Sequence, residues 1–162
     1  MSRMKNRILL LVCMLAATLA LGVSATAAAP EITKFSFTDS YVDTVTCPGI
    51  PIETELTGRV TIKEFSETRV QVHQNLVYRA TANGKSFTDN ESFTVFANPQ
   101  TGVQKFAGTV INIQIPGHGN VLHDAGVLVA DFSTDPPTVF HEGGPHPQFH
   151  DGYGALCDYL AS

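Results

Sequence analysis

The spacing of turn-forming residues most constrains the fold of this chain. From Thr33 onward, segments of about 8–13 residues are separated by turn signals such as Pro48-Gly49, Asn83-Gly84 and Asn98-Pro99. No amphipathic segment of about 12 residues, the length that a helical crossover needs, stands between them. The spacing therefore predicts an all-β domain of antiparallel strands and excludes a parallel α/β sheet.

Alternation of apolar and polar residues identifies the half-buried strands. Residues 56–63 place Leu, Gly, Val and Ile on one face and Thr, Arg and Lys on the other, and residues 69–81 repeat this period. Asn83-Gly84 follows. Because a two-residue Asn-Gly turn of type I′ needs positive φ at both positions, which this pair tolerates best, it predicts a hairpin into a strand over 86–96.

Further strands are predicted at 34–37 with 41–47, and at 103–115, 121–132 and 138–142. Residues 121–132 are nearly apolar on both faces, which is typical of a central strand. Residues 152–160 are expected to form a short terminal helix with Asp151 as its N-cap. We therefore expect about seven or eight strands in an antiparallel β-barrel, or alternatively a sandwich, with a short C-terminal helix.

Residues 1–27 have the three parts of a secretory signal peptide. Arg3, Lys5 and Arg7 precede an apolar stretch of about 15 residues, and Ala25-Thr26-Ala27 forms a small-residue cleavage site. Cleavage after Ala27 leaves residues 28–162 as a single secreted domain. The apolar stretch is shorter than the roughly 20 residues of a membrane span, so no stable span is expected after cleavage.

The processed domain is acidic, and its charge limits its partners. Removing residues 1–27 takes three of the ten Lys and Arg residues and none of the fifteen Asp and Glu residues, so the net charge changes from −5 to −8. This charge argues against nucleic acid and anionic membrane surfaces as partners.

The cysteines predict one disulfide. Cys13 leaves with the signal peptide, which makes Cys47 and Cys157 the only pair in an oxidising compartment. Their bond would close a loop of about 110 residues and tie the terminal helix to the end of the first strand. Chain-entropy arguments give such a bond roughly 4–5 kcal/mol of stabilisation.

Five of the six histidines follow residue 117. Because imidazole is the commonest metal ligand, His141, His146 and His150 are candidate ligands, with Asp124, Glu142 and Asp151 as carboxylates adjacent to histidines. Their spacing matches no established metal motif, and the Gly and Pro residues among them indicate a surface loop, which favours histidines that only anchor the loop. No cofactor is therefore expected.

Nucleophilic catalysis finds no support in the sequence. There is no Gly-x-Ser-x-Gly motif, no unpaired cysteine after cleavage and no Gly-rich phosphate loop, so no catalytic residue is predicted. Asp124, in the most apolar strand, is expected to accept hydrogen bonds from the loop 116–120 and fix its shape.

The interior of the expected barrel is the remaining candidate for a binding site. A barrel of about eight strands can enclose one small apolar ligand, although side chains fill most small barrels. The side chains expected inside are Val70, Val72, Leu76, Phe87, Phe93, Val95, Val110, Val127 and Val129.

Several short motifs resemble those of small exported β-rich proteins from high-GC Gram-positive bacteria. The similarity rests on Pro116-Gly117-His118-Gly119, Asp124-Ala125-Gly126, Asp131, Gly144-Pro145-His146 and Leu156-Cys157, and covers about the last 50 residues together with Cys47. It implies export and a β-rich fold, with no catalytic residues to carry over. A further analogy to lipocalin-like or dirigent-like barrels concerns strand number alone.

These features favour a secreted, non-enzymatic β-barrel domain that binds a small apolar ligand or a surface partner, with no prediction of oligomeric state. Two alternatives stay open. One is a metal-dependent enzyme that uses the C-terminal histidines. The other is a structural or interaction protein with a filled core.

Overall fold

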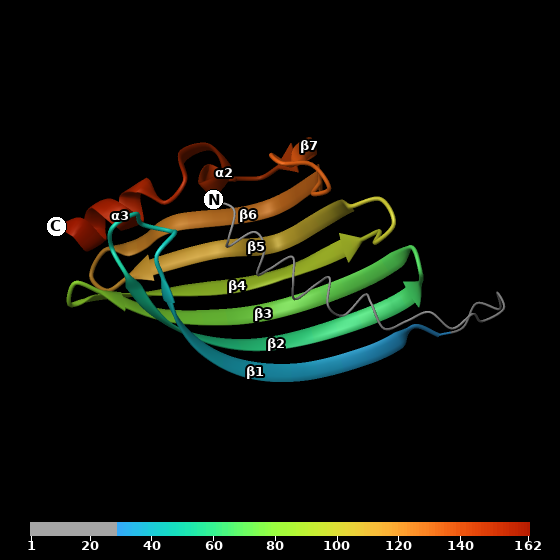
Figure 1. Cartoon of the computed structure of the whole chain (residues 1–162), viewed down its shortest axis with the longest axis horizontal. Helices are drawn as coiled ribbons and strands as arrows, with labels where there is room; N and C mark the ends of the chain where they lie inside the picture. Colours follow the sequence, from blue (N-terminus) through green and yellow to red (C-terminus); the bar gives the residue numbers. More distant parts are fainter. Residues whose placement is uncertain (1–28) are drawn as a thin grey trace.

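The computed structural model describes residues 29–162, apart from the side chains of residues 149 and 150, and these residues form one antiparallel sheet with two short helices (Figure 1). The predicted signal peptide, residues 1–27, lies outside the described residues. The strands are β1 (Glu31–Asp43), β2 (Ile52–Ser66), β3 (Arg69–Ala82), β4 (Lys85–Ala97), β5 (Val103–Ile115), β6 (Gly119–Asp131) and β7 (Thr138–Gly143), followed by α2 (Pro147–Asp151) and α3 (Gly154–Ala161).

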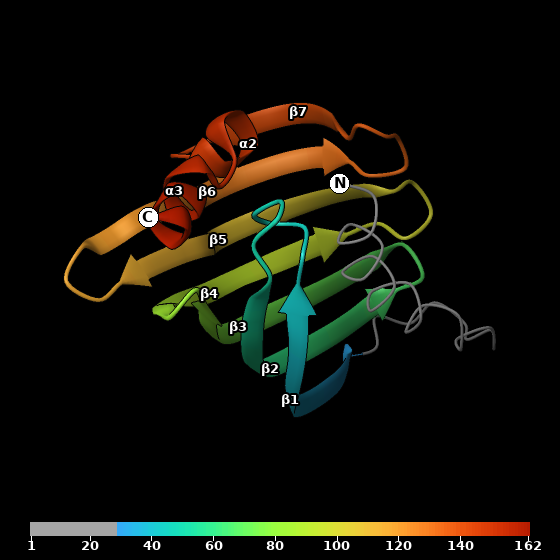
Figure 2. The ribbon, with the colours of Figure 1, turned by 60° about the vertical axis from the view of Figure 1, so that its left-hand side comes forward.

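The seven strands form a meander in which each strand pairs with the next in the chain. The antiparallel all-β prediction and the terminal helix are thus confirmed. Asn83 and Gly84 have φ of 52° and 74°, which confirms the predicted hairpin turn. The sheet is not a closed barrel, because β1 and β7 are its two edges and do not pair with each other (Figure 2).

The sheet is strongly curved (Figure 2). Its buried side chains form two clusters on the concave face. Along β2, Ile52, Val60 and Ile62 are buried on the concave side. The odd-numbered positions 53–61 alternate with them and point to the convex side, where most are exposed. The strand register places the buried positions of neighbouring strands on the same face.

Irregular pairing accompanies this curvature. The β4–β5 and β5–β6 pairs contain register shifts, and such bulges bend a strand and increase its twist. Gly108 on β5 has a φ of 125°, and a Cβ atom there would collide with the carbonyl oxygen of Ser92 on β4. Only glycine allows the two strands to approach so closely at this bend.

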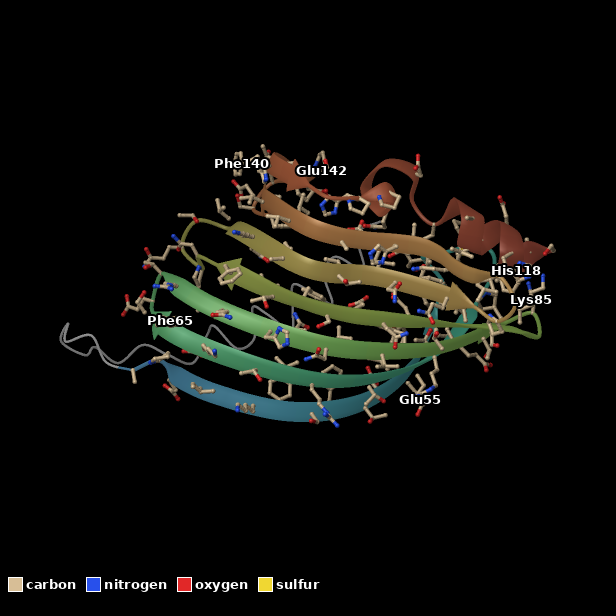
Figure 3. The ribbon with its side chains drawn as sticks, turned by 180° about the vertical axis from the view of Figure 1, so that it is seen from behind. Glu55, Phe65, Lys85, His118, Phe140 and Glu142 are labelled. Carbon is tan, nitrogen blue, oxygen red and sulfur yellow. A yellow bond between two sulfur atoms is a disulfide. The ribbon has the colours of Figure 1, made fainter. Side chains whose placement is uncertain are left out.

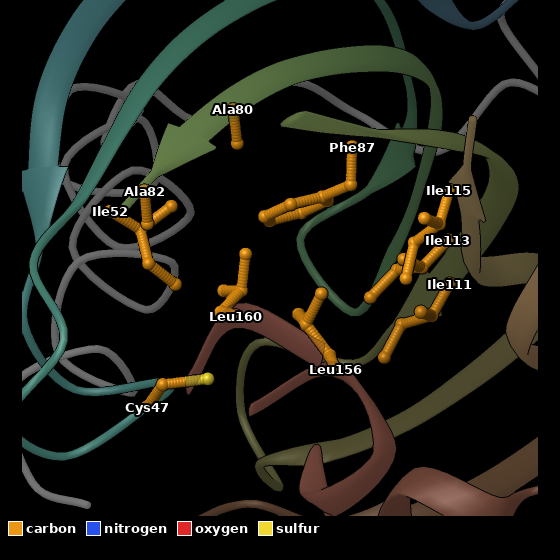
Figure 4. Close-up of a cluster of buried hydrophobic side chains, with 10 residues drawn as sticks. All are labelled: Cys47, Ile52, Ala80, Ala82, Phe87, Ile111, Ile113, Ile115, Leu156 and Leu160. Atoms are coloured by element: carbon orange, nitrogen blue, oxygen red, sulfur yellow. The ribbon is translucent and has the colours of Figure 1, made fainter. Parts of the chain in front are cut away.

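Helix α3 covers one end of the concave face (Figure 4). Leu156 and Leu160 are buried in a group that we call the helix cluster, which is completed by Cys47, Ile52, Ala80, Ala82, Phe87, Ile111, Ile113 and Ile115. At the other end, Leu76, Phe93 and Val95 form the open-end cluster, against which Phe37, Leu56, Val72 and Phe106 are partly buried.

The predicted disulfide between Cys47 and Cys157 is present and joins α3 to the segment after β1. The last turn of α3 is also held by the β3–β4 hairpin, because Asn83 Nδ2 donates to the carbonyl oxygen of Leu160 at 3.0 Å. The predicted N-cap was wrong. Asp151 ends α2, and Gly152, whose φ is 66°, separates α2 from α3, whose N-cap Tyr153 makes no side-chain capping bond.

Candidate functional site

Polar side chains gather on the concave face between the two apolar clusters. On β4, Asp89 and Glu91 lie between Phe87 of the helix cluster and Phe93 of the open-end cluster. The same alternation places Tyr78 of β3 on the concave face. Tyr41 of β1 and Tyr153, directly before α3, complete this carboxyl–tyrosine cluster, since each interacts electrostatically with one or more of these groups.

Asp89 and Glu91 lie two residues apart on the same face of β4 and form a carboxyl pair. Asp89 is buried, and its Oδ1 accepts a hydrogen bond from the backbone N–H of Asn112 at 2.6 Å. Burial raises the pKa of Asp89, while its bonds to Asn112 and Glu91 oppose the shift. Burial, followed by the charge of Asp89 and their shared hydrogen bond, raises the pKa of Glu91 well above its usual range. Burial thus favours the neutral form of both carboxyl groups.

The tyrosines around this pair keep their protons. Burial raises the pKa of Tyr78 far above its ordinary value, and the nearby charge of Glu91 adds to the shift. Burial and then the charge of Glu91 likewise raise the pKa of Tyr153, which also interacts with Asp89, Asp43 and Asp124. Neutral hydroxyl groups both donate and accept hydrogen bonds, so the cluster offers a bound polar group several partners.

Asp124 pairs with His146 and not with the loop that the sequence suggested. The two side chains are nearly fully buried, and Asp124 Oδ1 lies 2.7 Å from His146 Nδ1. His146 Nε2 lies 3.3 Å from the carbonyl oxygen of Gly143. Burial alone lowers the pKa of His146, but the hydrogen bond and charge of Asp124 outweigh it, with help from Gly143 and Glu142, and the pKa is raised.

This pair holds the segment between β7 and α2 against β6. With Nδ1 on a carboxylate and Nε2 on a carbonyl oxygen, both ring nitrogens of His146 act as donors, as in an imidazolium. The backbone N–H of Ala125 also donates to the carbonyl oxygen of Pro145 at 3.0 Å. The other carboxylate oxygen of Asp124, Oδ2, is buried and has no hydrogen-bond partner among the described residues.

The three candidate metal ligands are placed differently. His141 is exposed on β7, His146 is buried against Asp124, and His150 lies in α2 with its side chain outside the described atoms. Among the described residues, no three His, Cys, Asp or Glu side chains are grouped as a metal site would require.

Most of the predicted interior is confirmed. Leu76, Phe87, Phe93 and Val95 are buried on the concave face, Val72 and Val110 pack against the clusters, and Val70 shares their face. Val127 and Val129 were predicted wrongly, because in β6 the concave positions are Asp124, Leu128 and Ala130. Since both faces of β6 are largely apolar, its alternation did not indicate which face was buried.

The roles of Asp89 and Glu91 were not predicted from the sequence, although a signal was present. Side chains two residues apart in a strand point to the same face, and Asp89 and Glu91 alternate with Phe87, Phe93 and Val95 in this way. A correct assignment of the strand therefore places two carboxyl groups among buried apolar residues.

The site thus belongs to an all-β domain whose single curved sheet holds acidic and aromatic side chains beneath a disulfide-linked helix. Comparison with models of known protein families, with curated proteins and with solved structures finds no match for this chain. Within residues 29–162, none of the helices has the length and apolar character needed to cross a membrane.

Proposed function

We propose that this chain is an exported, non-enzymatic domain that binds a small, largely apolar ligand at the open end of its concave face. The observation that carries the proposal is the incomplete cover of that face. Helix α3 packs on the helix cluster only, and Phe37, Leu56 and Phe106 beside the open-end cluster are only partly buried. Export is supported by the Cys47–Cys157 disulfide, which suits an oxidising compartment.

Aromatic side chains give this surface its affinity for an apolar ligand. The ring of Phe106 has centroid distances of 6.1 Å to Phe93 and 5.5 Å to Phe132, and Phe35 lies 6.3 Å from Phe37. Phe35 is 38 % exposed on the same face. In this proposal the sheet acts as a barrel that has opened between β1 and β7, and the ligand occupies the part that α3 leaves uncovered.

The carboxyl–tyrosine cluster supplies the polar contact. It follows directly on the open-end cluster along β4, where Glu91 precedes Phe93 by two residues. A ligand lying on the phenylalanines therefore brings one end toward Glu91 and Tyr78, where a hydroxyl or carbonyl group finds both donors and acceptors.

The test is a titration of the folded, oxidised protein with an uncharged naphthalene-type fluorescent dye. We expect saturable binding that Phe106→Ser weakens roughly tenfold, because the ligand would bury only the part of the ring that is still exposed, about half of the roughly 1.5–3 kcal/mol of full burial.

Phe96→Ser is the matched control. Phe96 is 42 % exposed, and its position next to Val95 in β4 places it on the convex face. Dye affinity should therefore be unchanged, with both variants measured below their melting transitions. Absence of saturable binding to the wild type, or equal losses in the two variants, would contradict the proposal and favour a structural protein with a filled core.

A further inference from the structure

The charges of this domain are separated between the two faces of its sheet. Of the seven Lys and Arg residues after residue 28, six lie on the convex face by strand register. Five of them lie toward the end remote from α3 or at the middle of the strands, and we call this group the basic patch. Its members are Lys34, Arg59, Lys63, Arg69 and Lys105.

The basic patch is not neutralised from within the chain. Among the described residues, no carboxylate lies within ion-pair distance of any of its five cations. The convex-face carboxylates of the strands, Glu53, Glu55 and Asp131, lie toward α3 or at the last residue of β6, and Glu67 lies in the β2–β3 turn. Figure 3 shows Phe65 at the end of the sheet opposite Lys85 and His118, which mark the α3 end.

A shallow hollow of about 370 Å³ lies within this patch. Its polar lining consists of Lys34, Thr61, Lys63, Gln71, His73 and Thr94, with no carboxylate. Lysine, threonine and glutamine side chains all donate hydrogen bonds, so the hollow is suited to an anionic group.

A chain of hydrogen bonds orients one of these donors. Asn75 Nδ2 lies 3.0 Å from His73 Nε2, and because an amide nitrogen only donates, Nε2 is the acceptor. The proton of neutral His73 is then on Nδ1, which donates to Thr94 Oγ1 at 3.0 Å. Ser92 Oγ donates to Asn75 Oδ1 at 2.9 Å and completes the chain. The hydroxyl proton of Thr94 is thereby left for a bound group.

Cations continue across the sheet from the hollow. In the cross-strand row that contains Lys63, Gln71, Phe96 and Lys105, each residue pairs directly with the next. Neighbouring strands are about 4.8 Å apart, so the backbones at Lys63 and Lys105 are roughly 14 Å apart. A ligand that contacts both must be an extended molecule with several anionic groups.

We propose that the basic patch is a docking surface for an acidic polysaccharide, with one carboxylate or sulfate group in the hollow and further anionic groups along the row. This goes beyond the proposed function, because it concerns the opposite face. Five cations on a domain with a net negative charge can neutralise the widely spaced charges of such a polymer. They suit the closely spaced phosphates of nucleic acid less well, because these would also be repelled by the acidic domain. Its hydroxyl groups also match the Ser, Thr and Asn side chains between the cations.

A lipid surface fits these side chains less well. Arg69 lies 4.4 Å above the ring of Phe65, and Lys105 lies 5.8 Å from the ring of Phe96. The rings stay partly exposed, Phe96 by 42 %, but each lies against a cation that would have to leave it before the ring could insert into a bilayer.

The test measures binding of the folded protein to polygalacturonate in low salt, with neutral dextran as the control polymer. We expect binding that weakens steeply as salt is added, and that Lys63→Gln/Lys105→Gln weakens roughly tenfold, since two of the five cations that face the polymer are then lost.

Arg79→Gln removes a cation from the same face beside Glu53 and Glu55, and should change affinity less than about twofold. Thr94→Val should weaken binding whereas Thr88→Val, on the same face of β4, should not. The proposal is overturned by absence of binding, by equal binding of dextran, by equal losses in the Arg79 and double-lysine variants, or by tighter binding to duplex DNA, poly-glutamate or anionic phospholipid vesicles.

Discussion

Removing the disulfide tests how α3 is held on the sheet. In a Cys47→Ser/Cys157→Ser variant, the chain loses a link between residues 110 positions apart. The chain-entropy model gives roughly 4–5 kcal/mol for a loop of this length, and measured losses for native disulfides are roughly 2–5 kcal/mol. For a domain of this size we expect the melting temperature to fall by roughly 5–20 °C.

The loss should begin at α3. This helix has eight residues, too few to be stable alone, and it buries only Leu156 and Leu160. The hairpin contacts from Asn83 and Lys85 remain in the variant, so the helix should loosen before the sheet unfolds.

The assay combines thermal unfolding with hydrogen exchange of the α3 amides. Reduction of the wild type is the matched control and should lower its melting temperature by a similar amount, while leaving that of the double variant unchanged. Two titratable thiols in denatured, unreduced protein would disprove the bond. An unchanged melting temperature with protected α3 amides would refute the role that we assign to it.

Three further predictions follow from the buried titratable groups and the N-terminus. The pKa values of Asp89, Glu91 and His146 are higher in the folded than in the unfolded protein, so protonation of these groups favours the folded state. This contribution to stability is complete at pH values below the unfolded pKa values, and it is lost as pH rises through the folded pKa values. The free energy of unfolding should therefore fall as pH rises above the ordinary carboxyl pKa of about 4, less steeply in Glu91→Gln; stability that rises with pH there would contradict the assignment. Micromolar zinc should leave the melting temperature unchanged, since both ring nitrogens of His146 are bonded within the chain, and a shift of several degrees would show a metal site. Intact mass of the exported protein should place its first residue at Ala28 or within two residues of it, and retention of the apolar stretch would refute cleavage.

The local features of the fold were predictable from the sequence. Alternation in 56–63 identified the buried face of β2, Asn83-Gly84 identified the β3–β4 turn, and β5 has the predicted bounds. The disulfide followed from counting cysteines, which needs no knowledge of tertiary structure.

The features that the sequence did not predict depend on contacts distant along the chain. Asp124 meets His146 only because the segment after β7 folds back onto β6. Closure of the sheet depends on its accumulated twist and on bulges in β4, β5 and β6, which no local pattern specifies. Predicting the candidate site would have required knowing which face of β4 carries Asp89 and Glu91, and that this face is the concave side of the sheet.

The most direct test of the proposed function is to map the bound dye by NMR on the isotopically labelled, oxidised protein. We expect shift changes concentrated at Phe37, Phe93 and Phe106, extending to Glu91, with Phe96 unaffected. Changes concentrated on the convex face, or no changes at saturating dye, would contradict ligand binding on the concave face.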